Sequence, residues 1–197
     1  MRVCLLLGST KPNGNTEELC KPFVEELKNH QVEVDFITLY DKQIHPCIGC
    51  LTCQKARDSY GCAIQDDMQA VIDSIVKADV LVMATPIYTW QAATPLKSVM
   101  DRMLGLIKLK TEHEVITLNP ASQPYALITT CGDDIPHGTG PLEQCMKYMC
   151  DYSGRHYFGM YAFQDTNGID DFKTEEAVQG AKDFAGKVID YIQQAKD

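Results

Sequence analysis

The fold is decided by the stretch at residues 2–16, which reads RVCLLLGSTKPNGNT. Its first half is a short apolar run of the kind that forms a buried β-strand. The run stops at Gly8, and mostly small and polar residues follow as far as Thr16. From Thr16 to His30 apolar residues recur at helical spacing, which predicts an amphipathic helix. A strand, a glycine-containing turn and a helix in this order begin a β–α–β unit, in which the strands run parallel.

The same alternation continues along the chain and indicates a parallel sheet with helices on its faces. Strands are expected at Arg2 to Leu7, Val32 to Leu39, Asp79 to Thr85, Tyr125 to Thr130 and His156 to Phe163. Helices are expected at Thr16 to His30, from Asp66-Asp67, from Thr94 as an N-cap before Pro95, at Pro141 to Tyr152, and at Thr174 to Gln194. We interpret the less regular stretch from Lys108 to Gln123 as a loop with a short extra strand at Val115 to Leu118. Without an internal repeat, the pattern predicts a single domain over residues 1–197.

Composition narrows the class of protein. The chain has 197 residues, of which 45% are hydrophobic, and this is enough for one domain with a substantial core. Its formal net charge is −9, and its 18 lysines and arginines form no run, which disfavours a nucleic-acid binder. No stretch approaches the roughly 20 apolar residues of a membrane span, and we expect no signal peptide. We therefore expect small molecules or other proteins as partners, with no nucleic acid and no membrane.

Cysteines are frequent and unevenly placed. There are nine, an odd number, and Cys47, Cys50, Cys53 and Cys62 lie within one short segment. This is not the spread-out spacing of a secreted disulfide scaffold, so we expect a reducing, cytoplasmic environment. Thiolates at this density suit a [4Fe-4S] cluster or a zinc ion. Bare thiols that cover a ligand, or a redox-active thiol pair, are also compatible with the spacing.

Ligands of an open parallel sheet bind beyond the carboxyl ends of its strands, so the segments after the strands are candidate sites. The segment after the first strand holds two glycines, two amides, hydroxyl side chains such as Ser9, and Lys11, just before a helix start. Free backbone N–H groups at a helix start and short hydroxyl side chains suit a phosphate group. The spacing matches neither Gly-x-Gly-x-x-Gly nor a P-loop, which disfavours both of those sites. An ordinary polar turn with a helix cap is the alternative.

Two further segments follow strands. Residues 85–90 read TPIYTW, and such an apolar and aromatic segment can form the wall of a site for a flat aromatic ligand. Alternatively, Tyr88 and Trp90 are core or subunit-contact residues. Residues 129–134 read TTCGDD, and their small side chains permit a close approach of the backbone to a ligand. A plain turn is the alternative there.

Together these segments resemble the NADPH-dependent FMN reductase and iron–sulfur flavoprotein family of the flavodoxin-like superfamily. The resemblance is close from Arg2 to Asp134, and beyond it only the pattern is similar. Three of its motifs are Gly8-Ser9 with Gly14-Asn15-Thr16, the Pro86-Ile87-Tyr88 turn, and the helix with Leu96-Lys97 and Asp101-Arg102. The fourth is the cysteine motif Pro46-Cys47-x-Gly49-Cys50-x-x-Cys53, which is followed by Cys62 and Asp66-Asp67-Met68. It implies an α/β fold of the flavodoxin-like class, with three α/β/α layers and a five-stranded parallel sheet in the order 2-1-3-4-5.

The resemblance also implies a set of FMN-binding residues. The phosphate would be held by Ser9, Lys11, Asn13, Asn15 and Thr16. The isoalloxazine ring would lie along Pro86, Ile87, Tyr88, Thr89 and Trp90, with Thr130, Cys131, Gly132 and Asp133 near its other edge. The flavin carries the hydride in this family, so no catalytic side chain is expected. We interpret Asp101-Arg102 as a structural helix pair.

The implied function is that of an oxidoreductase in which NAD(P)H reduces FMN and a small acceptor, such as a quinone, a flavin or a nitro- or azo-aromatic compound, takes the electrons. The resemblance further implies a homodimer or higher homo-oligomer. It makes Cys47, Cys50, Cys53 and Cys62 the ligands of a [4Fe-4S] cluster, although the gap before Cys62 is longer here than in cluster-bearing members. Two other functions stay open: an electron-transfer iron–sulfur flavoprotein with a cluster on this loop, and a redox-sensing module without turnover.

Overall fold

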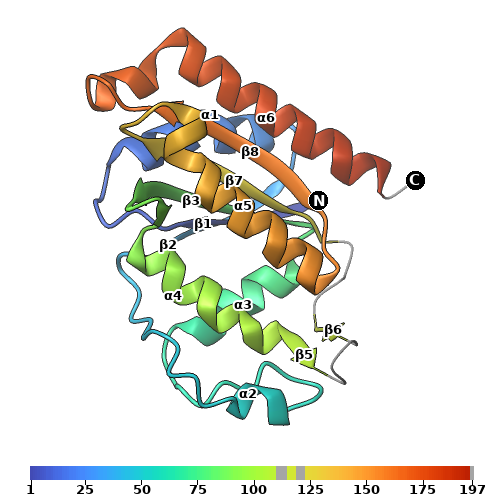
Figure 1. The fold of residues 1–197 in the computed structure, drawn as a ribbon. Helices are drawn as coiled ribbons and strands as arrows, with labels where there is room; N and C mark the ends of the chain where they lie inside the picture. The colour runs from blue at the N-terminus through green and yellow to red at the C-terminus, as the bar shows by residue number, and fades with distance from the viewer. Residues whose placement is uncertain (110–114, 119–122, 196–197) are drawn as a thin grey trace.

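A parallel sheet forms the centre of the computed structural model, which describes residues 1–109, 115–118 and 123–195 (Figure 1). The strands of the sheet lie in the order β2-β1-β3-β7-β8, and every neighbouring pair is parallel. In chain order this is 2-1-3-4-5, which confirms the predicted topology. The strands are β1 (Arg2–Leu7), β2 (Glu33–Thr38), β3 (Val80–Tyr88), β7 (Tyr125–Cys131) and β8 (Tyr157–Gln164).

Helices cover both faces of the sheet and complete the predicted three layers (Figure 1). On one face lie α1 (Asn15–Asn29) and α6 (Glu175–Gln194). On the other lie α3 (Met68–Lys77), α4 (Thr94–Arg102) and α5 (Ile135–Ser153). Within the described ranges, no helix is both long enough and apolar enough to cross a membrane.

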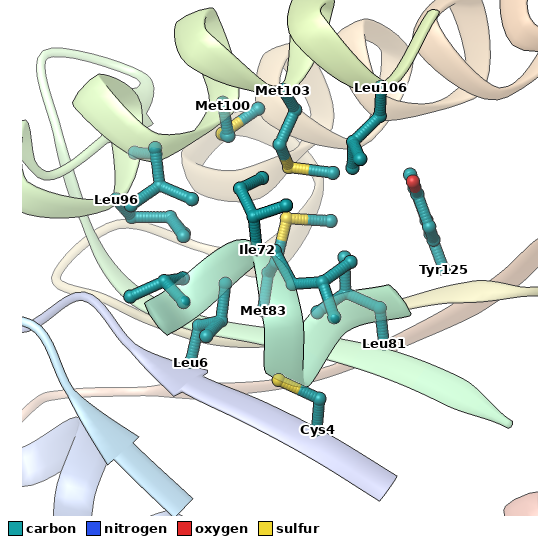
Figure 2. Packing of buried hydrophobic residues seen from close by; sticks show 14 of the residues in the cluster. Cys4, Leu6, Ile72, Leu81, Met83, Leu96, Met100, Met103, Leu106 and Tyr125 are labelled. Atoms are coloured by element: carbon teal, nitrogen blue, oxygen red, sulfur yellow. The ribbon is translucent and has the colours of Figure 1, made fainter. Parts of the chain in front are cut away.

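The central strands are buried on both faces, so their side chains alternate between two separate cores. Figure 2 shows the first core, in which Cys4 and Leu6 of β1 and Met83 of β3 share a cluster with Ile72 of α3 and Met100 of α4. The odd-numbered residues of β1 belong to the second core, under α1 and α6. The apolar run at the start of the chain is therefore a strand with no solvent-facing side, as its composition predicts.

The structure contains elements beyond those predicted. β3 continues to Tyr88 and forms a tight hairpin with β4 (Gln91–Ala92). The expected extra strand is present as β6 (Val115–Thr117), and its antiparallel partner β5 (Ile107–Leu109) was not predicted. Other parts of that loop lie outside the described residues. Three short helical segments are also additional: α2 (Thr52–Lys55), η1 (Met103–Leu106) and η2 (Ile169–Lys173).

The predicted start of α5 is wrong. The helix begins at Ile135 rather than at Pro141, which lies inside it. The side chain of Asp134 caps the helix by accepting a hydrogen bond of 3.2 Å from the His137 N–H. The acidic residues after the fourth strand therefore do not form a plain turn, because one of them starts a helix.

One glycine brings the end of β1 close to the start of α4. The Gly8 N–H donates to the Ala84 carbonyl oxygen at 2.7 Å, so the chain stays beside β3 as it leaves β1. A Cβ atom at position 8 would lie only 2.4 Å from Cβ of Leu96 and 3.3 Å from that oxygen. Only glycine permits this approach without a shift of either element.

We expect Gly8→Ala to lower the free energy of unfolding by about 1–3 kcal/mol, because the methyl group overpacks the contact with Leu96. Gly186→Ala is the matched control, since no atom lies within 4 Å of a Cβ there and alanine favours the helical conformation of α6. It should raise the free energy of unfolding by about 0.5–1 kcal/mol. Urea unfolding followed by circular dichroism measures both, and a Gly8→Ala variant as stable as the wild type would contradict the close packing.

Candidate functional site

A cavity of about 160 Å³ lies at the carboxyl ends of β1, β3 and β7, where the sequence analysis expects a ligand. Most of the predicted phosphate-site and ring-site residues meet in its wall. The lining residues are Ser9, Lys11, Gly14, Asn15, Thr16, Pro86, Ile87, Tyr88, Thr130, Cys131, Gly132 and Asp165. The three predicted segments and a fourth, which contains Asp165, therefore converge on one cavity.

A second cavity, of about 190 Å³, adjoins the first and holds most of the remaining predicted residues. The two cavities share Ile87, Cys131 and Gly132, and the second adds Thr89, Trp90, Asp133 and Gly138. Asn13 is a predicted residue that lines neither cavity. Its φ of 51° and the 2.7 Å hydrogen bond from its N–H to Glu17 place it in the turn before α1.

The N-terminus of α1 forms one end of the first cavity. Its N-cap residue is Gly14, and among the described residues no side chain caps the helix. Because the first N–H groups of a helix have no partner within it, they can bind an anion, which the helix dipole also favours. Ser9 shapes the loop, with its hydroxyl donating to the Lys11 carbonyl oxygen at 3.1 Å and accepting from the Lys11 N–H at 3.2 Å.

Two contacts join this helix end to the neighbouring strands. The hydroxyls of Thr16 and Thr130 lie 2.7 Å apart, which ties α1 to the end of β7. The Asn15 amide donates to the carboxylate of Asp165, which follows β8. Asp165 is absent from the predicted site because it follows the fifth strand, whereas the candidate segments follow the first, third and fourth strands. The same rule, applied to that strand, finds it.

The hairpin between β3 and β4 presents aromatic side chains beside both cavities. Its two turn residues have positive φ, 51° for Thr89 and 60° for Trp90. This conformation is unfavourable for a β-branched residue such as threonine, and strained backbone of this kind concentrates at functional sites. Tyr88 and Trp90 are 51% and 54% exposed, so neither is a core residue.

Thr85 links this hairpin to α4. Its hydroxyl donates to the Pro86 carbonyl oxygen at 2.9 Å and accepts from the Ala93 N–H at 3.0 Å. Ala93 is the N-cap of α4, so the expectation that Thr94 caps this helix is wrong. A buried hydroxyl from the strand end therefore binds the backbone N–H of the N-cap residue itself.

The cysteine segment borders a separate cavity of about 40 Å³, lined by Cys47, Cys50, Cys53 and Cys62 together with the end of α4. The sulfurs do not converge on a common point. Across the residues that the structure describes, no group of three or more cysteine, histidine, aspartate or glutamate side chains is placed to hold a metal ion. The residues as they lie therefore do not fit the [4Fe-4S] cluster that the resemblance implies.

A buried ion pair anchors this segment to α4. Arg102 donates to the Asp66 carboxylate at 2.6 Å, and the two side chains are only 1% and 3% exposed. Burial alone would raise the pKa of Asp66, but hydrogen bonds from Arg102 and from the N–H groups of His45 and Met68 outweigh it, so its pKa lies well below the ordinary value.

Asp101 and Arg102, interpreted as a structural helix pair, have separate partners. Asp101 pairs with Lys97 on the surface at 2.6 Å, while Arg102 points into the protein toward Asp66. Adjacent residues of a helix face different directions, so their partners differ.

Asp66→Asn should lower the free energy of unfolding by about 3–5 kcal/mol at pH 7, because it leaves Arg102 buried without its counter-charge. A carboxylate with a lowered pKa stabilises the fold above its unfolded pKa, and this contribution is lost as the pH falls below about 4. The difference between wild type and variant should therefore shrink below about pH 4. Urea unfolding between pH 7 and pH 3 measures it.

Asp101→Asn is the control, since its ion pair is exposed and should contribute less than about 1 kcal/mol. A difference between wild type and Asp66→Asn that does not change with pH would contradict the role given to the carboxylate.

Comparisons with known proteins identify the family and the fold of the chain. Residues 1–147 match the family model described as NADPH-dependent FMN reductase. The iron-sulfur flavoprotein MJ1083 of Methanocaldococcus jannaschii is 33% identical over 102 residues, which are 52% of this chain and 51% of that protein. The putative NAD(P)H-dependent FMN-containing oxidoreductase YwqN of Bacillus subtilis is 23% identical over 184 residues, 92% of this chain and 94% of that protein. The chain spans about half the length of the iron-sulfur flavoproteins that it matches.

Solved structures share the fold. An FMN-dependent NADH-azoreductase from Bacillus anthracis in complex with FMN aligns with a TM-score of 0.70 over 95% of this chain and 99% of that chain, at 15% identity. An NAD(P)H:quinone oxidoreductase from Methanothermobacter marburgensis aligns with a TM-score of 0.71 over 94% and 97% of the two chains, at 17% identity. The fold is therefore flavodoxin-like. Since the family model covers well over half of the residues, the chain belongs to the NADPH-dependent FMN reductase family.

Proposed function

We propose that this protein is an FMN-dependent oxidoreductase that uses NAD(P)H to reduce a small acceptor. The observation that carries the proposal is the cavity at the carboxyl ends of β1, β3 and β7. It joins an uncapped helix N-terminus to a hairpin with exposed aromatic side chains. A phosphate at one end and a flat ring at the other match these two features.

The residues at the start of α1 fit the FMN phosphate. In our proposal, Ser9 and Thr16 offer hydroxyl groups, Asn15 an amide and Lys11 a positive charge, next to backbone N–H groups that no side chain caps. Asn13 contributes through the shape of the turn rather than through the cavity wall. A dianion gains both hydrogen bonds and the favourable end of the helix dipole here.

The ring site is proposed to use Pro86, Ile87, Tyr88, Thr89 and Trp90 along one side and Thr130, Cys131, Gly132 and Asp133 near the other edge. The space that a Cβ atom would occupy at Gly132 has no other atom within 4 Å, so the backbone there is open to a ligand. When bound, FMN would provide the chemistry of hydride and electron transfer. We assign no catalytic side chain, since the protein's part is to bind and orient the reactants.

The acceptor belongs, in our proposal, to the quinone, flavin, nitro-aromatic or azo-aromatic class. The half-exposed rings of Tyr88 and Trp90 can stack on such planar molecules. The same rings would also suit an interface with a second copy of the chain, so we propose a homodimer. A reducing compartment such as the cytoplasm agrees with nine cysteines that are all free thiols.

Anaerobic reduction tests the proposed reaction. NADPH or NADH should bleach the visible flavin absorbance of the FMN-loaded protein in a stopped-flow experiment, and a quinone or azo compound should then restore it. Stoichiometric bleaching by a nicotinamide is expected because the bound flavin accepts its hydride. A lack of bleaching with both nicotinamides would overturn the proposal.

Ser9→Ala tests the phosphate site separately from turnover. We expect about tenfold weaker binding of FMN, because a hydroxyl hydrogen bond to a charged group is lost. Riboflavin has no phosphate, so its affinity should stay unchanged. Ser74→Ala, on α3 outside both cavity linings, serves as the matched control. Titration of flavin fluorescence gives both affinities, and an equal loss for FMN and riboflavin would place the phosphate elsewhere.

A second candidate is an electron-transfer iron–sulfur flavoprotein. Its support comes from relatives that bear this name and from the four cysteines around one cavity. The arrangement of the described residues, which brings no three metal ligands together, weighs against it. Iron and acid-labile sulfide in anaerobically purified protein would favour this candidate, and their absence would favour the first.

A further inference from the structure

The proposed flavin site leaves the cysteine segment without a role. Figure 1 shows α2 and its flanking loops beyond α3 and α4, on the side of these helices away from the sheet. The cavity of this segment is lined by residues at the end of α4, whereas the flavin cavity lies at the hairpin that precedes α4. The thiols therefore have an environment of their own.

Two of the thiols lie on chain segments that pack directly on each other. Gly61 has a φ of 63°, and a Cβ atom there would lie 2.2 Å from Cβ of Ala56 and 3.7 Å from Cα of Cys53. The backbone at Gly61, the residue before Cys62, therefore lies near the backbone of Cys53. Both cysteines also line the same small cavity. A disulfide needs Cα atoms about 4.4–6.8 Å apart, so neighbouring segments of this kind are a precondition for one.

A buried lysine holds these two segments together. Lys108 is 1% exposed, and its ammonium group donates to the carbonyl oxygens of Cys53 at 2.8 Å and Tyr60 at 3.4 Å. Among the described residues, no carboxylate pairs with it. The ammonium group therefore fixes the spacing of the two segments and adds positive charge beside the thiols.

A second buried cation lies against Cys62. Arg102 donates from Nη2 to Sγ of Cys62 at 3.4 Å, while its Nη1 group binds Asp66. Its Nε atom is buried and has no hydrogen-bond partner in the described structure. Arg102 therefore fixes the position of the Cys62 sulfur at the wall of this cavity.

The size of the cavity limits what can enter. Its volume is about 40 Å³ and its lining is largely apolar. A single water needs about 10–15 Å³ by the same kind of measure, so a molecule of a few heavy atoms fits. Hydrogen peroxide meets this limit, whereas a tripeptide disulfide such as oxidised glutathione does not.

We propose that Cys53 and Cys62 form a dithiol that hydrogen peroxide oxidises to a disulfide. The Cys62 thiolate attacks one peroxide oxygen, the O–O bond breaks, and the leaving hydroxide takes up a proton to become water. The Cys53 thiol then attacks the sulfenic acid of Cys62, an S–S bond forms, and the second oxygen leaves as water. In total, two thiols and one hydrogen peroxide give one disulfide and two waters.

The experiment uses a Cys47→Ser/Cys50→Ser variant, purified without air and then treated with hydrogen peroxide. Trypsin cuts after Lys55 and Arg57, so Cys53 and Cys62 fall on different peptides, and the two serines leave Cys53 as the one cysteine on its peptide. Mass spectrometry after alkylation should find these peptides joined by a reducible bond. Under denaturing conditions, the wild-type thiol count should fall by two. Peptides that remain separate would overturn the proposal.

Single variants separate the two steps. Cys53→Ser should stop at the sulfenic acid, which dimedone added together with denaturant labels on Cys62, and Cys62→Ser should give neither label nor cross-link. Cys145→Ser, on α5 away from this cavity, should react as the wild type does. Faster oxidation by glutathione disulfide than by an equal concentration of peroxide would contradict the assigned oxidant, and iron bound by the untreated protein would contradict a free dithiol.

Discussion

The close contact between Gly8 and Leu96 constrains the end of the sheet where the candidate cavity lies. It brings the end of β1 against the start of α4, and the α1 N-terminus must then begin beside the hairpin that precedes α4. Thr16 and Thr130 add the end of β7 to the same place through their hydroxyl contact. A phosphate cradle and an aromatic wall can face one cavity because this approach leaves no room for a side chain at position 8.

The sequence predicts this part of the fold well because the local signals agree there. β1 is an unbroken apolar run, and the structure buries its side chains in two cores, one on each face. A strand of this kind must lie in the interior of a sheet, and parallel neighbours follow from the helices between the strands. The rule that ligands bind beyond strand ends then locates the loops around Ser9, Pro86 and Gly132 without any tertiary information.

What the sequence could not show depends on contacts between distant residues. β8 ends at the edge of the sheet where the chain leaves β1 and enters α1. The carboxylate of Asp165 meets Asn15 only for this reason. The partner of Arg102 is Asp66 rather than its neighbour Asp101, and only the packing of α4 on the cysteine segment decides between them. The start of α5 is hard to predict because a proline inside a helix has the same local appearance as one at its first turn.

The cysteine segment illustrates this limit most clearly, since its motif indicates one chemistry and its placement favours another. Ile48 and Leu51 are largely exposed, while Tyr60 is buried in the first core. Buried polar groups also hold the segment: Arg102 through Asp66 and Cys62, and Lys108 through the carbonyls of Cys53 and Tyr60. Hydrogen bonds of this kind are directional, so they determine where each sulfur lies. The spacing of the residues in the sequence does not specify these positions. The geometry of the ligands, rather than their number, therefore decides between the two chemistries.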